Sequence, residues 1–376
     1  MSKSLEMNVD GLLDYSLGIK PGEKVFIFAD LNALEYCNLI AARIIEKGAT
    51  PFILWNDFEL NRALISSKNE SIYKAMYDMY EGMIDSCDAA IMLDNNIEEY
   101  QNIPTDDVLF FKNRYYLKIF QKIMLFKRWT YLRYPQQELA DLFQLSYDEL
   151  VKLLEQVTNF DYAGIEENAK ILKEVLDKTE KIRVVNGDGT DVTFTKKGIA
   201  SAACCGKWNL PDGEVYTAPE KYSMNGEIYF SFDTFFRGKT YKNIWVKVKD
   251  GKIIDSRCSL DDEFRKILDS DEGSRYFGEF AFGLNPYIER NYNDNLFNEK
   301  MCKTVHFAIG EPHYNTDNGN KSIMHWDLIV NMQSGGLIYF DDVLVQKDGV
   351  FVDERLAALN NTPDEPKKLV KTIQSL

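Results

Sequence analysis

The sequence lacks an excess of basic residues and lacks long apolar runs, and each absence excludes a class of function. Its 376 residues hold 44 lysines and arginines against 59 aspartates and glutamates, for a formal net charge of −15. Nucleic acids and anionic membrane surfaces are bound through basic surfaces, so neither is expected as a partner. No uninterrupted apolar run approaches the ~20 residues that span a bilayer, so no membrane segment is predicted.

The six cysteines lack the spacing of a disulfide framework and of a C-x-x-C motif. Free, mostly buried thiols are therefore expected, as in proteins of a reducing compartment. The first eight residues also lack the apolar core of a signal peptide. Together these absences predict a cytoplasmic protein.

The length of the chain and its local patterns predict two domains. A chain of this size exceeds one ordinary hydrophobic core. Residues 24–28 form a short β-rich run, residues 33–47 carry apolar positions at helical spacing, and residues 51–55 resume as strand. A further buried strand is expected at residues 89–93. Residues 1–178 are therefore predicted to form an N-terminal α/β domain with Rossmann-like βαβ units.

The first turn from strand to helix in this domain lacks the glycines of a dinucleotide-binding loop. It reads Ala29-Asp30-Leu31-Asn32 where the fingerprint would require G-x-G-x-x-G. Without those glycines the backbone cannot approach a pyrophosphate closely. A Rossmann-like fold without a dinucleotide cofactor is the prediction.

The pattern changes near residue 179. Residues 136–178 are strongly helical, whereas from Ile182 onward short β-rich runs alternate with turn signals such as Asn186–Gly189. We expect residues 179–376 to form a separate C-terminal domain that is α+β and rich in strands.

Histidine is scarce, and all three histidines lie close together, at His306, His313 and His325. Imidazole is the commonest metal-binding side chain, so this clustering suggests a metal ion. Asp327 follows His325 by two residues in a β-like run, which places both side chains on one face of a strand and Trp326 on the other. For His306 alone, or for the H-x-D pair alone, a hydrogen-bonded core residue is the competing interpretation.

Two carboxylates stand in unusual surroundings. Glu214 follows a Pro-Asp-Gly turn at the start of a β-like run, and Glu279 lies among aromatic and small residues in 277–283. A carboxylate is costly to bury unless a cation or hydrogen bonds compensate it. Glu279 is therefore either buried beside a cation or exposed, with its aromatic neighbours turned inward.

Four motifs follow one another along the second half of the chain. They are N-L-P-D-G-E-V-Y-T-A-P (209–219), G-E-F-A-F-G-L-N-P (278–286), H-F-A-I-G (306–310) and N-K-S-I-M-H-W-D (320–327). In sequence and in order they resemble the thermophilic aminopeptidase T family of dinuclear metallo-aminopeptidases, and the N-terminal domain matches the same family more loosely.

The resemblance implies a set of metal ligands and a reaction. The ligands it implies are Glu214, Glu279, His306, His325 and Asp327, with Glu279 between two divalent ions such as zinc, cobalt, manganese or magnesium. Two histidines with three carboxylates suit such ions. The implied activity is hydrolysis of the N-terminal peptide bond of peptides by a metal-activated water, and the resemblance also implies a homodimer.

One position departs from the family pattern, which places a catalytic tyrosine seven residues after the first histidine. This chain has His313 there and Tyr314 one residue later. Three interpretations are open: Tyr314 fills the role through a local shift, His313 replaces the tyrosine as proton donor, or His313 is simply exposed in a loop.

Two other functions compete with the aminopeptidase. A ring-cleaving dioxygenase of dihydroxypyridine resembles these aminopeptidases, and His306, His325 and Asp327 would then hold a single Fe(II). Glu214 and Glu279 argue against it, because a mononuclear iron site needs no additional carboxylates. The third interpretation is a binding protein that keeps the scaffold and has lost catalysis.

Four further polar residues have two interpretations each. Asn285 and Asn320 lie inside the matched motifs and are predicted either to orient metal ligands or to serve as ordinary turn residues. Lys127 and Arg128 line a channel for acidic substrates in one interpretation. In the other they belong to a solvated helix face.

Overall fold

The computed structural model describes residues 9–95, 103–126 and 128–360. The chain divides into two compact units, of which the first comprises Met1–Asn159 with Gly206–Leu210 and the second Phe160–Cys205 with Pro211–Leu376. The expected boundary between residues 178 and 179 is the end of helix α9 (Tyr162–Lys178), and this helix packs with the second unit. As a limit between domains, that boundary stays a prediction.

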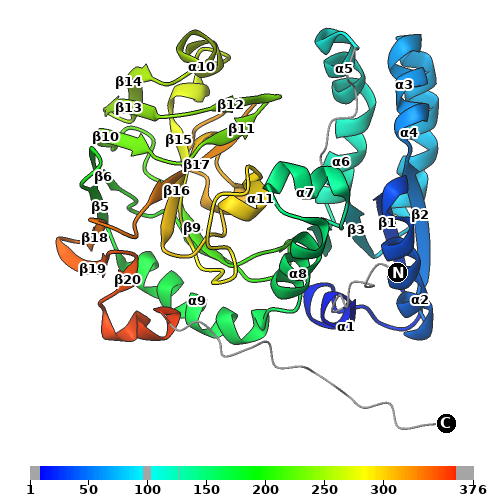
Figure 1. Cartoon of the computed structure of the whole chain (residues 1–376), viewed down its shortest axis with the longest axis horizontal. Helices are drawn as coiled ribbons and strands as arrows, with labels where there is room; N and C mark the ends of the chain where they lie inside the picture. The colour runs from blue at the N-terminus through cyan, green and yellow to red at the C-terminus, as the bar shows by residue number, and fades with distance from the viewer. Residues whose placement is uncertain (1–8, 96–102, 127, 361–376) are drawn as a thin grey trace. The chain divides into compact units, whose positions relative to one another are not determined.

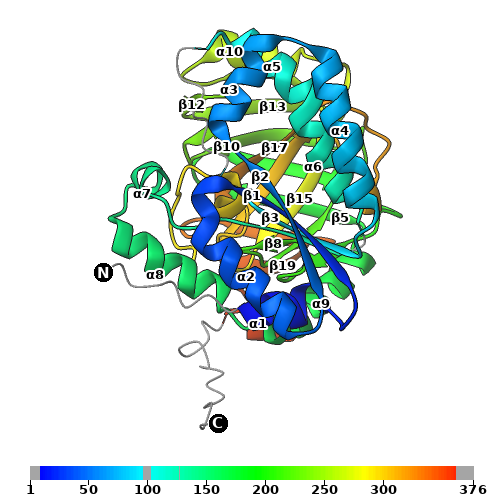
Figure 2. The ribbon, with the colours of Figure 1, turned by 90° about the vertical axis from the view of Figure 1, so that its right-hand side faces the viewer.

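The first unit is built on a five-stranded parallel sheet in the order β2-β1-β3-β4-β8, and Figure 2 shows β2, β1 and β3 side by side. The predicted βαβ unit and the following strand are confirmed. The elements are β1 (Lys24–Asp30), α2 (Leu34–Glu46), β2 (Thr50–Asn56), β3 (Ala89–Leu93), β4 (Trp129–Leu132) and β8 (Asn209–Leu210).

Helices pack on this sheet because each carries one apolar stripe. One core joins Phe26, Phe28 and Met92 of the sheet to helices α3 to α6. Their bounds are α3 (Phe58–Ser67), α4 (Glu70–Asp85), α5 (Thr105–Phe111) and α6 (Leu117–Met124). Helices α7 (Gln137–Phe143) and α8 (Tyr147–Thr158), with α9, confirm the predicted helical stretch 136–178. Within the described ranges no helix combines the length and apolarity needed to cross a membrane.

Arg128 has a structural role in the first unit. Its guanidinium donates to Glu23 Oε1 at 2.8 Å and to the carbonyl of Leu17 at 3.0 Å. Bidentate pairing and carbonyl contacts of this kind fix a side chain in place. The expectation that it lines a substrate channel is therefore not supported, and its neighbour Lys127 lies outside the described residues.

The second unit contains two antiparallel sheets, shown in Figure 1. The larger follows the order β14 (Lys252–Arg257), β13 (Ile244–Lys249), β10 (Asn225–Phe230), β6 (Thr190–Thr195), β5 (Lys181–Asn186), β18 (Leu337–Phe340), β19 (Val343–Lys347), β20 (Val350–Phe351). The smaller follows β17 (His325–Asn331), β16 (Thr304–Gly310), β15 (Phe277–Gly283), β9 (Glu214–Thr217), β7 (Ala202–Cys204). A hairpin of β11 (Thr234–Phe236) and β12 (Lys239–Tyr241) and helices α10 (Asp261–Leu268) and α11 (Asn295–Asn298) accompany them. The parallel α/β unit and this strand-rich unit confirm the predicted fold class.

Aromatic side chains fill the space between the two sheets. Phe307 of β16 lies within 6.1 Å of Phe194 and 6.4 Å of Phe230, both in the larger sheet, measured between ring centroids. Trp326 is fully buried and stacks on Phe236 at 4.2 Å, which confirms that it points away from its histidine and aspartate neighbours. The smaller sheet thus buries one face in this core, and its other face is left for polar residues.

Candidate metal centre

The polar face of the smaller sheet carries the candidate residues because strands alternate their side chains. Glu279 of β15 pairs with Ala308 of β16, and Ala308 pairs with Asp327 of β17. In the next row His306 pairs with Ala281. Residues paired across strands share a face, so Glu279, His306 and Asp327 project into the same space from three neighbouring strands.

Small residues separate these polar side chains. Glu214 pairs with Gly283, and His325 pairs with Gly310 at the end of β16. A Cβ on Gly283 would lie 2.0 Å from the carbonyl oxygen of Met301, and one on Gly310 would lie 2.1 Å from that of Met324. The glycines therefore allow the backbone of Met301 and Met324 to lie close against the sheet beside the carboxylates and imidazoles.

One group of side chains gathers around Nε2 of His306. This nitrogen lies 3.3 Å from Glu279 Oε1, 3.6 Å from Glu214 Oε2 and 4.0 Å from Asp327 Oδ1. Ligand atoms of Glu214, Glu279 and His306 all lie within 4.8 Å of one another, and all three residues are buried. A single ion could contact all three.

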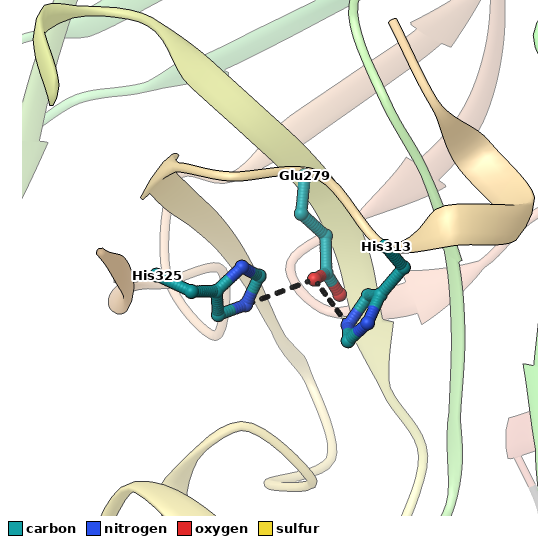
Figure 3. A group of neighbouring side chains, drawn as sticks. All are labelled: Glu279, His313 and His325. Atoms are coloured by element: carbon teal, nitrogen blue, oxygen red, sulfur yellow. Dashed lines mark ion pairs between the residues drawn. The ribbon is translucent and has the colours of Figure 1, made fainter. Parts of the chain in front are cut away.

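A second group gathers around the other oxygen of Glu279. His313 Nε2 lies 3.1 Å and His325 Nε2 lies 3.3 Å from Glu279 Oε2, and Figure 3 shows the two rings directed at the carboxylate. His325 Nε2 is also 3.3 Å from Asp327 Oδ1. Glu279 therefore offers one oxygen to each group, as a carboxylate between two ions would.

Buried atoms without hydrogen bonds show that these residues fit divalent cations. Glu214 Oε2, Glu279 Oε2 and Asp327 Oδ1 are buried, and no hydrogen bond to them is found within the described ranges. The Nε2 atoms of His313 and His325 come within 3.1 and 3.3 Å of Glu279 Oε2. Buried polar atoms are nearly always bonded, so several converging lone pairs without donors indicate a site for positive ions.

A backbone contact sets the tautomer of His325. Its Nδ1 lies 2.7 Å from the carbonyl oxygen of Glu311, which can only accept a hydrogen bond. Nδ1 therefore carries a proton, and Nε2, beside Glu279 and Asp327, is the nitrogen that would bind an ion once its own proton is lost. Backbone carbonyls hold metal-binding histidines in this way in many proteins.

A buried lysine that was not predicted from the sequence pairs with Glu214 Oε1, while Glu214 Oε2 is the oxygen near His306. Lys300 is 1% exposed, and its Nζ lies 2.6 Å from Glu214 Oε1, 2.7 Å from Glu299 Oε1 and 3.6 Å from Asp212 Oδ1. Cys204, Asp212 and Glu214 also lie close enough to hold an ion. The ammonium of Lys300 already pairs with these carboxylates, so this third group is an ion-pair network. No local motif marks the lysine, because Asp212 and Glu214 come from a distant segment and only Glu299 is its neighbour in the sequence.

Proton affinities within the centre are strongly shifted. Burial alone would raise the pKa of Glu279, but the neighbouring imidazoles of His313, His306 and His325 hold it well below its usual value. Burial would lower the pKa of His306, but the carboxylates of Glu279, Asp327 and Glu214 raise it to about 9. Without bound cations the centre therefore retains protons on histidine at neutral pH.

Binding of metal ions is accordingly expected to release protons. His306 must be neutral to bind an ion, and its raised pKa of about 9 means that it is mostly protonated at pH 7. Affinity should therefore rise with pH until about pH 9 and fall as pH drops. Calorimetric titration of Zn²⁺ at pH 7 in buffers of different protonation enthalpy should show release of at least about one proton per chain. Zn²⁺ binding without proton release would contradict this arrangement.

Tyr314 and the two asparagines lie away from the lone pairs of the centre. Tyr314 is 89% exposed, so the geometry favours His313 over a shifted tyrosine. Asn285 donates to the carbonyl of Asp212 at 2.8 Å, and Asn320 donates to that of Gly310 at 2.7 Å. Both asparagines fix backbone next to candidate ligands, and neither is bonded to a ligand side chain within the described part of the chain.

A known protein family matches most of the chain. The thermophilic metalloprotease (M29) family matches residues 1–338. The chain belongs to this family. The predicted resemblance to aminopeptidase T is thereby confirmed, and the paired histidine and glutamate groups of the centre are what a metalloprotease requires.

Relatives within the M29 family are distant but match over most of their length. Aminopeptidase T of Thermus thermophilus is 23% identical over 381 residues, covering 88% of this chain and 93% of the relative. Aminopeptidase T of Thermus aquaticus is 24% identical over 372 residues, covering 84% and 90%.

Two solved structures share the fold. Wild-type AmpT from Thermus thermophilus has a TM-score of 0.78 at 18% identity, covering 92% of this chain and 98% of the other. A 2,5-dihydroxypyridine dioxygenase from Pseudomonas putida has a TM-score of 0.60 at 12% identity, covering 93% and 97%. At these identities the structural likeness establishes the fold alone.

Proposed function

We propose that this M29 protein is an aminopeptidase that uses two divalent ions to hydrolyse the N-terminal peptide bond of peptides. One observation carries the proposal. The two oxygens of Glu279 face two separate groups of side chains, with His306 3.3 Å from Oε1, and His313 and His325 3.1 and 3.3 Å from Oε2. A carboxylate shared in this way suits a pair of ions.

The described side chains divide between two ion positions. Glu214, Glu279 and His306 would hold the first ion, and Glu279, His325 and Asp327 would hold the second. The buried oxygens of Glu214, Glu279 and Asp327 that lack hydrogen bonds support this assignment. When bound, divalent ions such as Zn²⁺, Co²⁺, Mn²⁺ or Mg²⁺ supply a Lewis acid for a carbonyl and lower the pKa of water.

A free N-terminus suits the proposed centre because a neutral amine nitrogen is a ligand that divalent ions accept. Three buried carboxylates, Glu214, Glu279 and Asp327, lie within 4.0 Å of His306 Nε2 and would hold the ions. An ion held there could bind the lone pair of the α-amine, as it would bind an imidazole nitrogen. The nitrogen of an acylated N-terminus has no such lone pair, so that peptide should be a poor substrate.

The comparisons with known proteins support the dioxygenase alternative only through the shared fold. His306, His325 and Asp327 do lie together, with the imidazole nitrogens 4.0 and 3.3 Å from Asp327 Oδ1. The buried carboxylates of Glu214 and Glu279 beside His306 favour two ions over one iron, since a 2-His-1-carboxylate site leaves its other positions open. The complete set of donors likewise favours catalysis over a binding protein, and the homodimer remains a prediction.

Metal content and a matched pair of substrates test the proposal. We expect about two divalent ions per chain, hydrolysis of leucine p-nitroanilide, and at least about 100-fold slower hydrolysis of its N-acetylated form, because the amine lone pair is lost. Chelation should abolish activity, and Zn²⁺ or Co²⁺ should restore it. Protein that retains one iron per chain and cleaves neither substrate would overturn the aminopeptidase and favour the dioxygenase.

A further inference from the structure

We propose that His313 is a ligand of the second ion, so that this ion has two imidazole ligands where the first has one. The inference rests on the two-ion function proposed above and assigns a role to the position at which the sequence departs from the tyrosine of the family pattern. It makes the two ion positions chemically unequal.

His313 lies at least as close to Glu279 as His325 does, so both belong to the second group. Its Nε2 lies 3.1 Å from Glu279 Oε2, closer than the Nε2 of His325 at 3.3 Å. Ligand atoms of Glu279, His313 and His325 all lie within 4.8 Å of one another. Figure 3 shows the rings of His313 and His325 on opposite sides of the carboxylate, both directed toward it.

The loop that carries His313 is held in place by the smaller sheet. The carbonyl of His313 accepts a hydrogen bond from the amide of Thr316 at 3.0 Å, and the side chain of Asn315 contacts the hydroxyl of Tyr216 at 3.0 Å. Asn318 then donates to the carbonyl of Phe277 at 2.9 Å. A residue that is merely exposed in a loop would not need such anchoring.

Two ring contacts orient the imidazole itself. The ring of Tyr216, on β9, lies 4.8 Å from that of His313 between centroids, and the ring of His325 lies 5.0 Å away. These contacts aim Nε2 at Glu279 and leave the side chain 44% exposed. An exposed ligand at the rim suits an ion that must also accept substrate.

Ion ligation accounts for two imidazoles meeting at one carboxylate oxygen. A single proton donor would explain one imidazole beside Glu279 Oε2, whereas the Nε2 atoms of His313 and His325 lie 3.1 and 3.3 Å from it on two sides. Lone pairs arranged around one point are what a cation requires.

The extra imidazole predicts different metal preferences at the two positions. The first has one nitrogen from His306 and carboxylates from Glu214 and Glu279, a set that accepts harder ions such as Mn²⁺ or Mg²⁺. The second has nitrogens from His313 and His325, which favour borderline ions such as Zn²⁺ and Co²⁺. The second position should therefore bind Co²⁺ more tightly.

Titration of metal-depleted protein with Co²⁺ tests the inference without measuring activity. Wild-type protein should bind two equivalents in two steps, with visible absorption bands growing in the first step. His313→Ala should weaken the tighter step by at least about 100-fold, because loss of a ligand costs no less than loss of its supporting contacts. It should also change the Co²⁺ absorption spectrum. Tyr314→Phe, at the exposed neighbouring position, should change neither.

The variant outcomes separate this inference from the proposed function. If His313→Ala binds both Co²⁺ ions with wild-type affinity and spectrum, His313 is not a ligand, even if turnover falls; that result would make it a proton donor, and the two-ion function would stand. If wild-type protein itself fails to bind two ions, the proposed function fails with it. Circular dichroism of the variants checks folding, which a side chain 44% exposed should not determine.

Discussion

Replacing Glu279 with glutamine is expected to abolish hydrolysis of aminoacyl chromogenic substrates while leaving the protein folded. The wild-type carboxylate gives one oxygen to each group, with His306 at 3.3 Å and His313 at 3.1 Å. Glutamine keeps the shape but offers one oxygen and one NH₂ group, which cannot bind a cation. We expect kcat to fall by more than about 1,000-fold, equal to about 4 kcal/mol of barrier.

The measurement pairs kinetics with metal content. Glu279→Gln should hold fewer than two ions per chain, and its circular dichroism should match wild type because the change is isosteric. Glu227→Gln is the matched control, since Glu227 is a partly exposed residue of β10 that pairs with Lys247 at 3.1 Å. Wild-type turnover in Glu279→Gln would show that this carboxylate is not shared between ions.

Replacing Lys300 with methionine is expected to destabilise the protein strongly when metal is removed. The lysine is 1% exposed, and its ammonium lies 2.6 Å from Glu214 and 2.7 Å from Glu299. Burial would lower its pKa, but the carboxylates of Glu214, Glu299 and Asp212 keep it well above its usual value, so it stays charged. Removing one partner of a buried ion pair costs about 3–5 kcal/mol, because the other charges remain buried without compensation.

Thermal unfolding with and without Zn²⁺ measures this effect. Bound ions would offset part of the lost positive charge, so the loss of stability should be larger in the metal-depleted protein. The same variant should bind the first ion more weakly, because Glu214 loses the contact that orients it. Lys249→Met, at an exposed position of β13, is the control. Equal unfolding temperatures for Lys300→Met and Lys249→Met would show that the network does not stabilise the fold.

Local patterns were sufficient to predict much of the fold and part of the centre. The strand at residues 24–28, the helix at 33–47 and the strand at 51–55 follow from short-range periodicity, and the structure has them as β1, α2 and β2. The H-x-D spacing predicted one shared face for His325 and Asp327, because side chains of a strand alternate. The two residues do meet, with 3.3 Å between Nε2 and Oδ1.

The sequence by itself determined which residue types are available: three histidines in one segment, two glutamates in motifs, and a histidine in place of the family tyrosine. Only the tertiary structure decided how they meet, because strand register is set by packing across the whole sheet, and a slip of one residue would turn each side chain to the other face. The register of β15 and β16 brings Glu279 and His306 together across 27 residues of chain. The same long-range packing places His313 beside Glu279, leaves Tyr314 exposed and brings Lys300 to Glu214.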